Sequence, residues 1–229
     1  MHRNGCLQVV ILAEMCPYVN TNLHFCRKYK YIMNKLTVTS TFKDKLNRLP
    51  QNSRVGDLDY LGADLPTYDN LLIVALVGTR KPTPYGKLQT IKFAEELSRA
   101  GVVIVSGLAL GIDCIAHDAV LSVNGKTIAV SPAGLAQIYP ATNRLSGEKI
   151  IEHGTIISEY SPAMMPRKVE FLERNRIIAA LSDLVMIPEA AKGSGSLDTA
   201  NHAHKMGIPV CVLPGNVTSP MSAGTNQLL

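Results

Sequence analysis

Short runs of apolar residues alternate with segments of helical periodicity from residue 71 almost to the end of the chain. The first run, LLIVALV at 71–77, is uninterrupted over seven residues, as is typical of a strand covered on both faces. In the next segment Leu88, Ile91 and Ala94 recur at helical spacing. The expected strands are 71–77, 102–107, 126–130, 155–160, 183–187 and 208–215, and the expected helices are 85–99, 112–122, 143–152, 169–181 and 196–206. These repeated units predict an α/β fold, a three-layer αβα sandwich with a mostly parallel sheet.

Composition excludes several other classes. Apolar residues make up 46% of the 229 residues, which is enough to bury a core and excludes a disordered chain. Five cysteines are too few for a disulfide scaffold, so we expect a reduced, cytoplasmic protein. No apolar run approaches the ~20 residues that span a bilayer, so we expect no membrane partner. The formal net charge of +5 is only weak support for a nucleic-acid partner.

Three segments are expected along the chain. Residues 1–32 read as a non-native or disordered leader, either an extended reading frame upstream of Met33 or a poorly ordered terminus. Residues 33–70 are a short lead-in, in which 42–49 could form one or two helical turns and 61–69 read as a loop. Residues 71–229 form the αβα core. Residues 216–229 close neither a helix nor a strand, and we expect the core to be truncated there.

The cysteines predict no metal site. Cys6, Cys16 and Cys26 recur every ten residues near His24, which makes a zinc site conceivable, but this spacing fits no common zinc pattern. We therefore predict neither a metal nor a cofactor.

Two Gly-containing turns predict where a ligand binds, because ligands of open α/β sheets lie beyond the carboxyl ends of the strands. Small and hydroxyl-bearing residues follow three strands, and two of these segments open helices, where backbone amides can bind an anion. The candidates in these loops are Gly78, Thr79 and Arg80 after the first strand, Ser106, Gly107 and Ala109 after the second, and Ser194, Gly195, Ser196 and Thr199 after the fifth. Glycine and serine that merely satisfy turn and N-cap geometry remain the alternative. Neither G-x-G-x-x-G nor G-x-x-x-x-G-K-[ST] is present.

A third group of candidates is basic. Arg174, Asn175 and Arg176 lie on the expected helix 169–181, and Arg144 adds positive charge in a neighbouring loop, as do Arg167 and Lys168. Residues two apart on a helix diverge by roughly 200°. One of the two arginines could therefore face a phosphate while the other forms a structural ion pair.

We predict no catalytic residue. Asp113 and His117 share a helical face and could form a general-base pair or half of a metal site, but a structural hydrogen bond is the favoured interpretation. Glu159 and Glu189 lie at or near strand ends and could act together on an N-glycosidic bond. A carboxylate that holds a loop through backbone amides is again the favoured interpretation.

The order of these loops resembles the DNA-processing protein A family, also called DprA or Smf. The matching stretches are VGTR (77–80), YG (85–86), VVIVSGLALGIDCIAH (102–117), TIAV (127–130), IYPATN (138–143), ISEY (157–160), FLERNRIIAALS (171–182), GSGSLDTA (193–200) and VLPGN (212–216). The resemblance implies a Rossmann-like, DNA-binding core and a homodimer that binds single-stranded DNA. It also implies protection of incoming DNA and loading of RecA in natural transformation, with no enzymatic activity and no cofactor.

The chain departs from the family pattern in three places. The loop after the third strand, Ser131 to Gly134, holds a single glycine, and Ala141 stands where many members have a lysine, which Arg144 could replace. The chain stops where many members continue to a small winged-helix domain. We expect an apolar dimer surface near the C-terminal end, around Leu228 and Leu229.

Two other functions remain open. Some relatives in the wider Rossmann-like superfamily sense nucleotides or cleave nucleoside monophosphates at the N-glycosidic bond, using a P-G-G-x-G-T-x-x-E motif. Here the corresponding stretch from Pro188 lacks the final glutamate, and residue 199 is threonine. A structural interaction module is the third interpretation.

Overall fold

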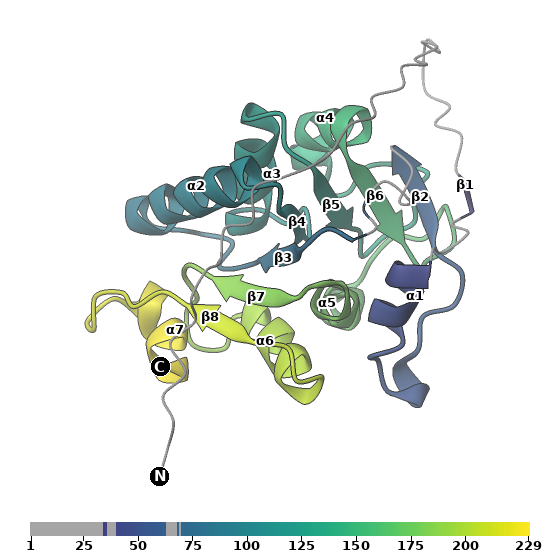
Figure 1. Ribbon diagram of the computed structural model, residues 1–229. Helices are drawn as coiled ribbons and strands as arrows, with labels where there is room; N and C mark the ends of the chain where they lie inside the picture. The colour runs from purple at the N-terminus through teal and green to yellow at the C-terminus, as the bar shows by residue number, and fades with distance from the viewer. Residues whose placement is uncertain (1–33, 36–39, 63–67, 69) are drawn as a thin grey trace. The chain divides into compact units, whose positions relative to one another are not determined.

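The computed structural model describes residues 34–35, 40–62, 68 and 70–229, and these form an eight-stranded sheet in the order β1-β2-β6-β5-β4-β3-β7-β8 (Figure 1). The strands are β1 (Asn34–Lys35), β2 (Asp59–Gly62), β3 (Ile73–Leu76), β4 (Val103–Ser106), β5 (Thr127–Val130), β6 (Thr155–Ser158), β7 (Leu184–Ile187) and β8 (Val210–Val212). The helices are α1 (Ser40–Leu46), α2 (Pro84–Arg99), α3 (Ile112–Ser122), α4 (Arg144–His153), α5 (Lys168–Leu181), α6 (Gly195–Lys205) and α7 (Ala223–Leu228). The expected leader and its cysteines lie outside the described residues.

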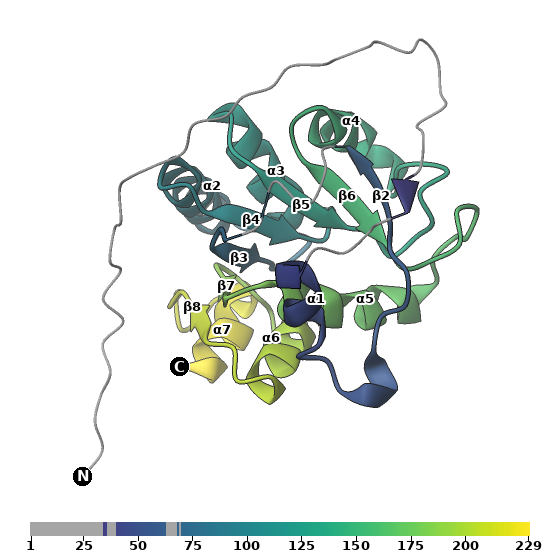
Figure 2. The same cartoon turned by 45° about the vertical axis from the view of Figure 1, so that its right-hand side comes forward.

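The predicted three-layer α/β sandwich is confirmed. Strands β3 to β8 run parallel to one another. Helices α2, α3 and α4 cover one face of the sheet, and α1, α5 and α6 cover the other (Figures 1 and 2). Each face has its own core, since Ile177, Ile178 and Leu181 of α5 belong to one buried cluster and Ala94 and Ala116 of α2 and α3 to another. The predicted core helices match the observed ones to within about a residue at either end.

The predicted loop 61–69 begins too early. Residues 59–62 form β2, which pairs antiparallel with β6 through Tyr60 opposite Ile157 and Leu61 opposite Ile156. Both Tyr60 and Leu61 are buried. The four-residue strand DYLG carries Asp and Gly, which are depleted in strands, so local propensity does not reveal it. Pairing with the otherwise open edge of β6 stabilises it.

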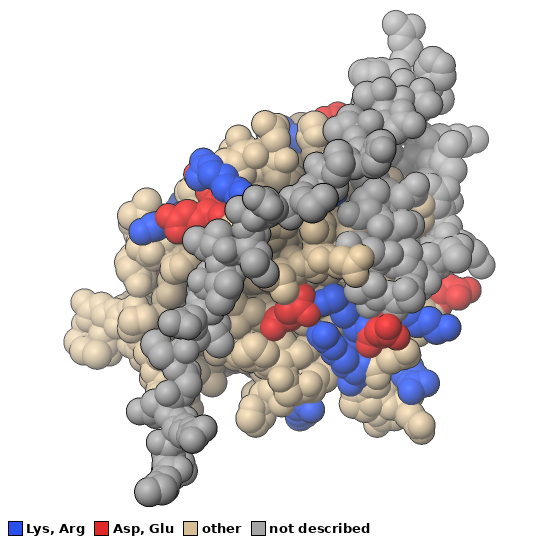
Figure 3. Space-filling view, in the orientation of Figure 1, with Lys and Arg blue, Asp and Glu red and all other residues tan. Residues whose placement is uncertain are grey.

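An ion-paired cluster attaches α1 to the core. Lys45 Nζ lies 2.5 Å and Arg48 Nη2 3.5 Å from the Asp183 carboxylate, at the start of β7. Asp183 also accepts a hydrogen bond from the Ile73 amide. Lys and Arg side chains gather near α1 in Figure 3, interleaved with Asp and Glu. These ion pairs therefore anchor α1 to the start of β7.

The chain end is more ordered than expected. Residues 220–222 form a 3₁₀ turn that leads into α7, whereas the sequence predicted neither helix nor strand there. The amides of Gly224 and Thr225 donate to the Ala190 carbonyl, and Asn226 exchanges hydrogen bonds with both backbone groups of Gly215. This short helix depends on tertiary hydrogen bonds, which leave no periodic signal.

In the part of the chain that the structure describes, no helix has both the length and the apolarity needed to cross a bilayer.

Candidate nucleic-acid interface

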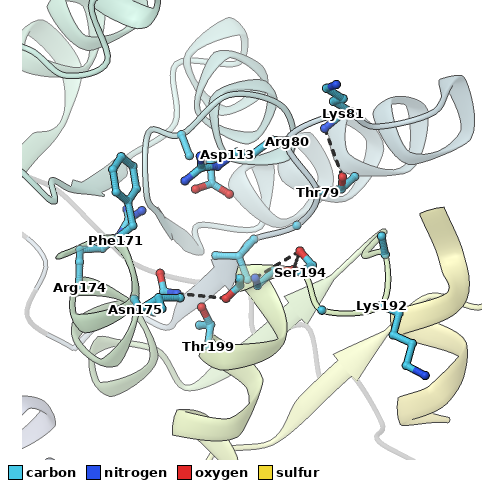
Figure 4. A pocket seen from close by; sticks show the side chains of 18 of the residues that line it. Thr79, Arg80, Lys81, Asp113, Phe171, Arg174, Asn175, Lys192, Ser194 and Thr199 are labelled. Atoms are coloured by element: carbon cyan, nitrogen blue, oxygen red, sulfur yellow. Dashed lines mark hydrogen bonds between the residues drawn. The ribbon is translucent and has the colours of Figure 1, made fainter. Parts of the chain in front are cut away.

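A pocket of about 680 Å³ lies where the strand order reverses. From β3 the chain adds β4, β5 and β6 on one side and then crosses to β7 and β8 on the other, so the loops after β3 and β7 diverge at this point. Such switch points are the usual ligand sites of open α/β sheets. Ten predicted residues line the pocket, namely Gly78, Thr79, Arg80, Ala109, Arg174, Asn175, Ser194, Gly195, Ser196 and Thr199 (Figure 4).

The loop after β3 is fixed from two sides. The Thr79 amide donates to the Glu189 carbonyl (2.9 Å), and the Ile112 amide donates to the Thr79 carbonyl (3.1 Å). Arg80 is exposed, and its guanidinium carbon lies 4.8 Å from the centre of the Phe171 ring. The loop thus presents an exposed arginine from a rigid base.

Gly111 packs closely against the loop after β3, with no space for a side chain. Its φ of +82° disfavours any side chain, and an added Cβ would lie 2.4 Å from the Thr79 carbonyl oxygen. Gly111→Ala is therefore expected to lower the free energy of unfolding by about 2 to 3 kcal/mol, measured by urea denaturation. Gly101→Ala is the matched control, because Gly101 has a φ of +83° with nothing within 4 Å. Equal losses in the two variants would show that the contact with Thr79 is unimportant.

Two predicted residues at the carboxyl end of β4 lie behind the pocket wall. Ser106 Oγ donates to the Leu76 carbonyl at 2.5 Å and is fully buried. Gly107 leaves room for Arg174, because an added Cβ would lie 1.9 Å from Arg174 Nη1. Both residues shape the wall without lining the pocket.

Arg174 is a buried cation at the pocket wall. It is 3% exposed, and its Nη1 donates to the Val130 carbonyl at 2.6 Å. Burial lowers its pKa to about 10, against the opposing attraction of Asp113. Burial likewise raises the pKa of the Asp113 carboxyl, although Arg174, backbone hydrogen bonds from Ala109 and Gly78, and Arg80 all act in the opposite direction. The two buried charges therefore stabilise each other.

The side chains weighed as catalytic candidates have structural partners. His117 is fully buried with Nδ1 2.7 Å from Thr127 Oγ1, and burial, with the Arg174 charge, lowers its pKa to about 3. Glu189 accepts hydrogen bonds from the Thr83 amide (2.8 Å) and hydroxyl (2.7 Å). Among the described residues, no group of three or more His, Cys, Asp or Glu side chains could hold a metal ion.

The start of α6 forms the opposite side of the pocket. Ser194 is the N-cap, its hydroxyl accepts from the Ser196 amide, and the two serine hydroxyls lie 2.8 Å apart. Asn175 Nδ2 donates to the Gly195 carbonyl at 3.1 Å and so joins α5 to this turn. The Thr199 side chain, one turn later, points towards the pocket (Figure 4).

Two predicted arginines lie away from the pocket lining. Arg176 Nη2 is 2.6 Å from the Glu159 carboxylate in a mostly buried ion pair. Arg144 is half exposed on α4, with its Nε 3.7 Å from Glu148. Of the arginines in the R-N-R motif, only Arg174 reaches the pocket.

Several pocket residues were not among the predicted site residues. Lys81, Lys168 and Lys192 are exposed, and Phe171 packs edge-on against Tyr139 with ring centres 6.0 Å apart. Lys168 was noted only as nearby charge. Its spacing to Phe171, Arg174 and Asn175 is that of one helix face, which was the available signal. With Arg80 and Arg174, five cations line the pocket against one carboxylate, Asp113.

Comparison with known proteins confirms the resemblance. Residues 57–229 match the model of the family described as DNA recombination-mediator protein A. The chain is 40% identical over 156 residues to DNA processing protein DprA of Bacillus subtilis and 47% identical over 143 residues to Protein Smf of Synechocystis. These alignments cover 68% and 62% of this chain but only 52% and 36% of the two relatives.

A solved structure of DNA processing protein A from Helicobacter pylori, described for its single-stranded DNA binding mode, is similar along most of its length. The TM-score is 0.79 at 41% identity, with 88% of each chain covered. The X-ray structure of DprA from Streptococcus pneumoniae gives a TM-score of 0.77 at 35% identity, covering 87% of this chain and 68% of that one. This chain belongs to the DNA recombination-mediator protein A family.

Proposed function

We propose that this chain binds single-stranded DNA in the switch-point pocket and acts as a recombination mediator. The observation that carries the proposal is the charge of the pocket, where five cations and the N-terminus of α6 surround a single buried carboxylate. Backbone phosphates of a single strand are the ligands that such a site favours. The single-stranded DNA binding described for the Helicobacter pylori relative supports the same ligand.

The geometry assigns distinct parts to the residues. Arg80 can place its planar fork on a phosphate, while the exposed Lys81, Lys168 and Lys192 add mobile positive charge at the rim. Phe171 offers a ring on which a base or a guanidinium can stack. Contacts of these kinds are made to phosphates and ring faces, so we expect little sequence preference.

The cellular role is part of the proposal. Membership of the family supports loading of RecA and protection of incoming DNA in natural transformation, carried out in the cytoplasm without catalysis or a cofactor. A homodimer could form through the apolar C-terminal surface, where Val217, Leu228 and Leu229 are exposed. Burial of such side chains favours association.

The test is fluorescence anisotropy of labelled oligo-dT with the full chain across a salt series. We expect the logarithm of the affinity to fall with the logarithm of salt concentration with a slope of about −2 to −4, at about −0.7 per phosphate contact. Duplex DNA and AMP should compete poorly. Efficient displacement by either would contradict a single-strand site.

A small-nucleotide pocket is the second candidate, because about 680 Å³ is a volume typical of small-molecule sites. With such a pocket the protein would be a nucleotide sensor or an N-glycosidic hydrolase. Against hydrolysis, the Glu189 carboxylate is engaged by Thr83, and Thr199 stands where the hydrolase motif has its glutamate. Release of free adenine from AMP by the pure protein would support this candidate over the first.

A further inference from the structure

We propose that the end of the pocket between α5 and α6 is a seat for a phosphate monoester, the terminal phosphate of a single DNA strand. This inference rests on the proposed function and adds a preference for strand ends to it.

One unsatisfied polar group, on Thr199, marks the seat, and a second, on Arg174, lies elsewhere in the pocket wall, beside Asp113. Six buried side-chain nitrogen or oxygen atoms lack a hydrogen-bond partner among the described residues, and two of them, Thr199 Oγ1 and Arg174 Nε, belong to residues that line the pocket. Thr199 is 1% and Arg174 3% exposed. Buried donors are rarely left unpaired in native proteins, so each indicates a missing acceptor. Phosphate oxygens accept from both a hydroxyl and a guanidinium.

The helix terminus is an independent indication of the same ligand. Helix α6 is eleven residues long and begins at Gly195 in the pocket wall, so its first amides and the positive end of its dipole lie there. Figure 4 shows Thr199 and Asn175 on this side, across the pocket from Arg80 and Asp113. A doubly charged anion gains more from such a field than a singly charged one.

The boundaries of the pocket favour a strand end over a continuous strand. On one side Asn175 hydrogen-bonds to the Gly195 carbonyl and joins α5 to α6. On another, the Thr79 hydroxyl donates to the Met221 sulfur at 3.8 Å, which joins the loop after β3 to the C-terminal segment. An internal phosphodiester must let the strand leave in two directions and offers two free oxygens. A terminal phosphate needs one exit and offers three.

The test compares short oligo-dT strands, on the order of six nucleotides, that end in 5′-hydroxyl, 5′-phosphate or 3′-phosphate. We expect a phosphate at one of the two ends to tighten binding about tenfold over the hydroxyl-ended strand. Thr199→Val should reduce this ratio to about twofold, whereas Thr199→Ser should retain it. Thr90→Val is the matched control, since Thr90 is a buried helical threonine whose hydroxyl donates to Gly86 outside the pocket.

Each outcome separates the inference from the proposed function. Equal affinity for all three strands, or a ratio that Thr199→Val does not change, would overturn the phosphate seat while single-strand binding stands. If no strand binds but dTMP does so in a Thr199-dependent way, the seat stands with a free nucleotide as its source. If neither strands nor dTMP bind, both proposals fail.

Discussion

The Arg80→Ala variant is expected to bind oligo-dT about 10- to 100-fold more weakly than the unaltered chain, because a charge-assisted hydrogen bond to phosphate is lost. Arg80 is exposed and its guanidinium packs over the Phe171 ring at the surface, so the fold should be unaffected. The salt dependence should also become shallower by about one phosphate contact. Anisotropy titrations at several salt concentrations measure both effects.

Arg99→Ala is the matched control for this variant. Arg99 ends α2, pairs with Glu95 on the same helix, and removes the same formal charge when replaced. Its replacement should leave affinity nearly unchanged, because Arg99 does not line the pocket. If both variants lose the same affinity, the effect reflects net charge and the pocket is not the binding site.

The order of strands and helices could be predicted from sequence because it depends on local periodicity, but the orientation of the helices could not. On α2, the spacing of Leu88, Ile91 and Ala94 predicted the helix correctly. Yet Leu88 and Ile91 are exposed at 62% and 40%, and the buried positions include Thr90 and Ala94. Small residues allow the helix to approach the sheet closely, and a hydrophobicity pattern ranks them below leucine.

The elements that sequence reasoning missed are held by distant partners. Strand β2 depends on β6, almost a hundred residues later, and α7 depends on hydrogen bonds to the Ala190 carbonyl. Neither has a pattern of its own that is long enough to detect. The pocket loops, in contrast, were predictable because the carboxyl ends of parallel strands meet at one edge.

Within the candidate site, residue type alone did not distinguish the side chains that line the pocket from those that lie behind its wall. Arg174 and Arg176 are two residues apart, yet one lines the pocket and the other pairs with Glu159. Arg174 shares a helical face with Lys168 and Phe171, and Arg176 does not. This spacing along α5 also identifies Lys168 and Phe171 as pocket residues. Ser106 and Gly107 lie at the end of β4 as predicted, but they contact Leu76 and Arg174 behind the pocket wall.

Replacement of Arg174 by methionine is expected to lower the free energy of unfolding by about 3 to 5 kcal/mol, measured by urea denaturation. The change leaves the Asp113 carboxylate buried without its cationic neighbour and removes the donor to the Val130 carbonyl. Methionine keeps much of the side-chain volume, so the loss reports charge and hydrogen bonding more than packing.

A double variant shows whether the two charges are coupled. Arg174→Met combined with Asp113→Asn should cost about 1 to 3 kcal/mol less than the sum of the single losses, because no uncompensated charge remains.

The stability of Arg174→Met should depend on pH with a defined sign. A carboxyl whose folded pKa is raised destabilises the fold at neutral pH, and this penalty is relieved as the pH falls through that pKa. The loss of unfolding free energy in Arg174→Met should therefore become smaller as the pH falls. Strictly additive losses, together with a loss that does not depend on pH, would mean that Arg174 stabilises the pocket wall through its hydrogen bond and packing alone.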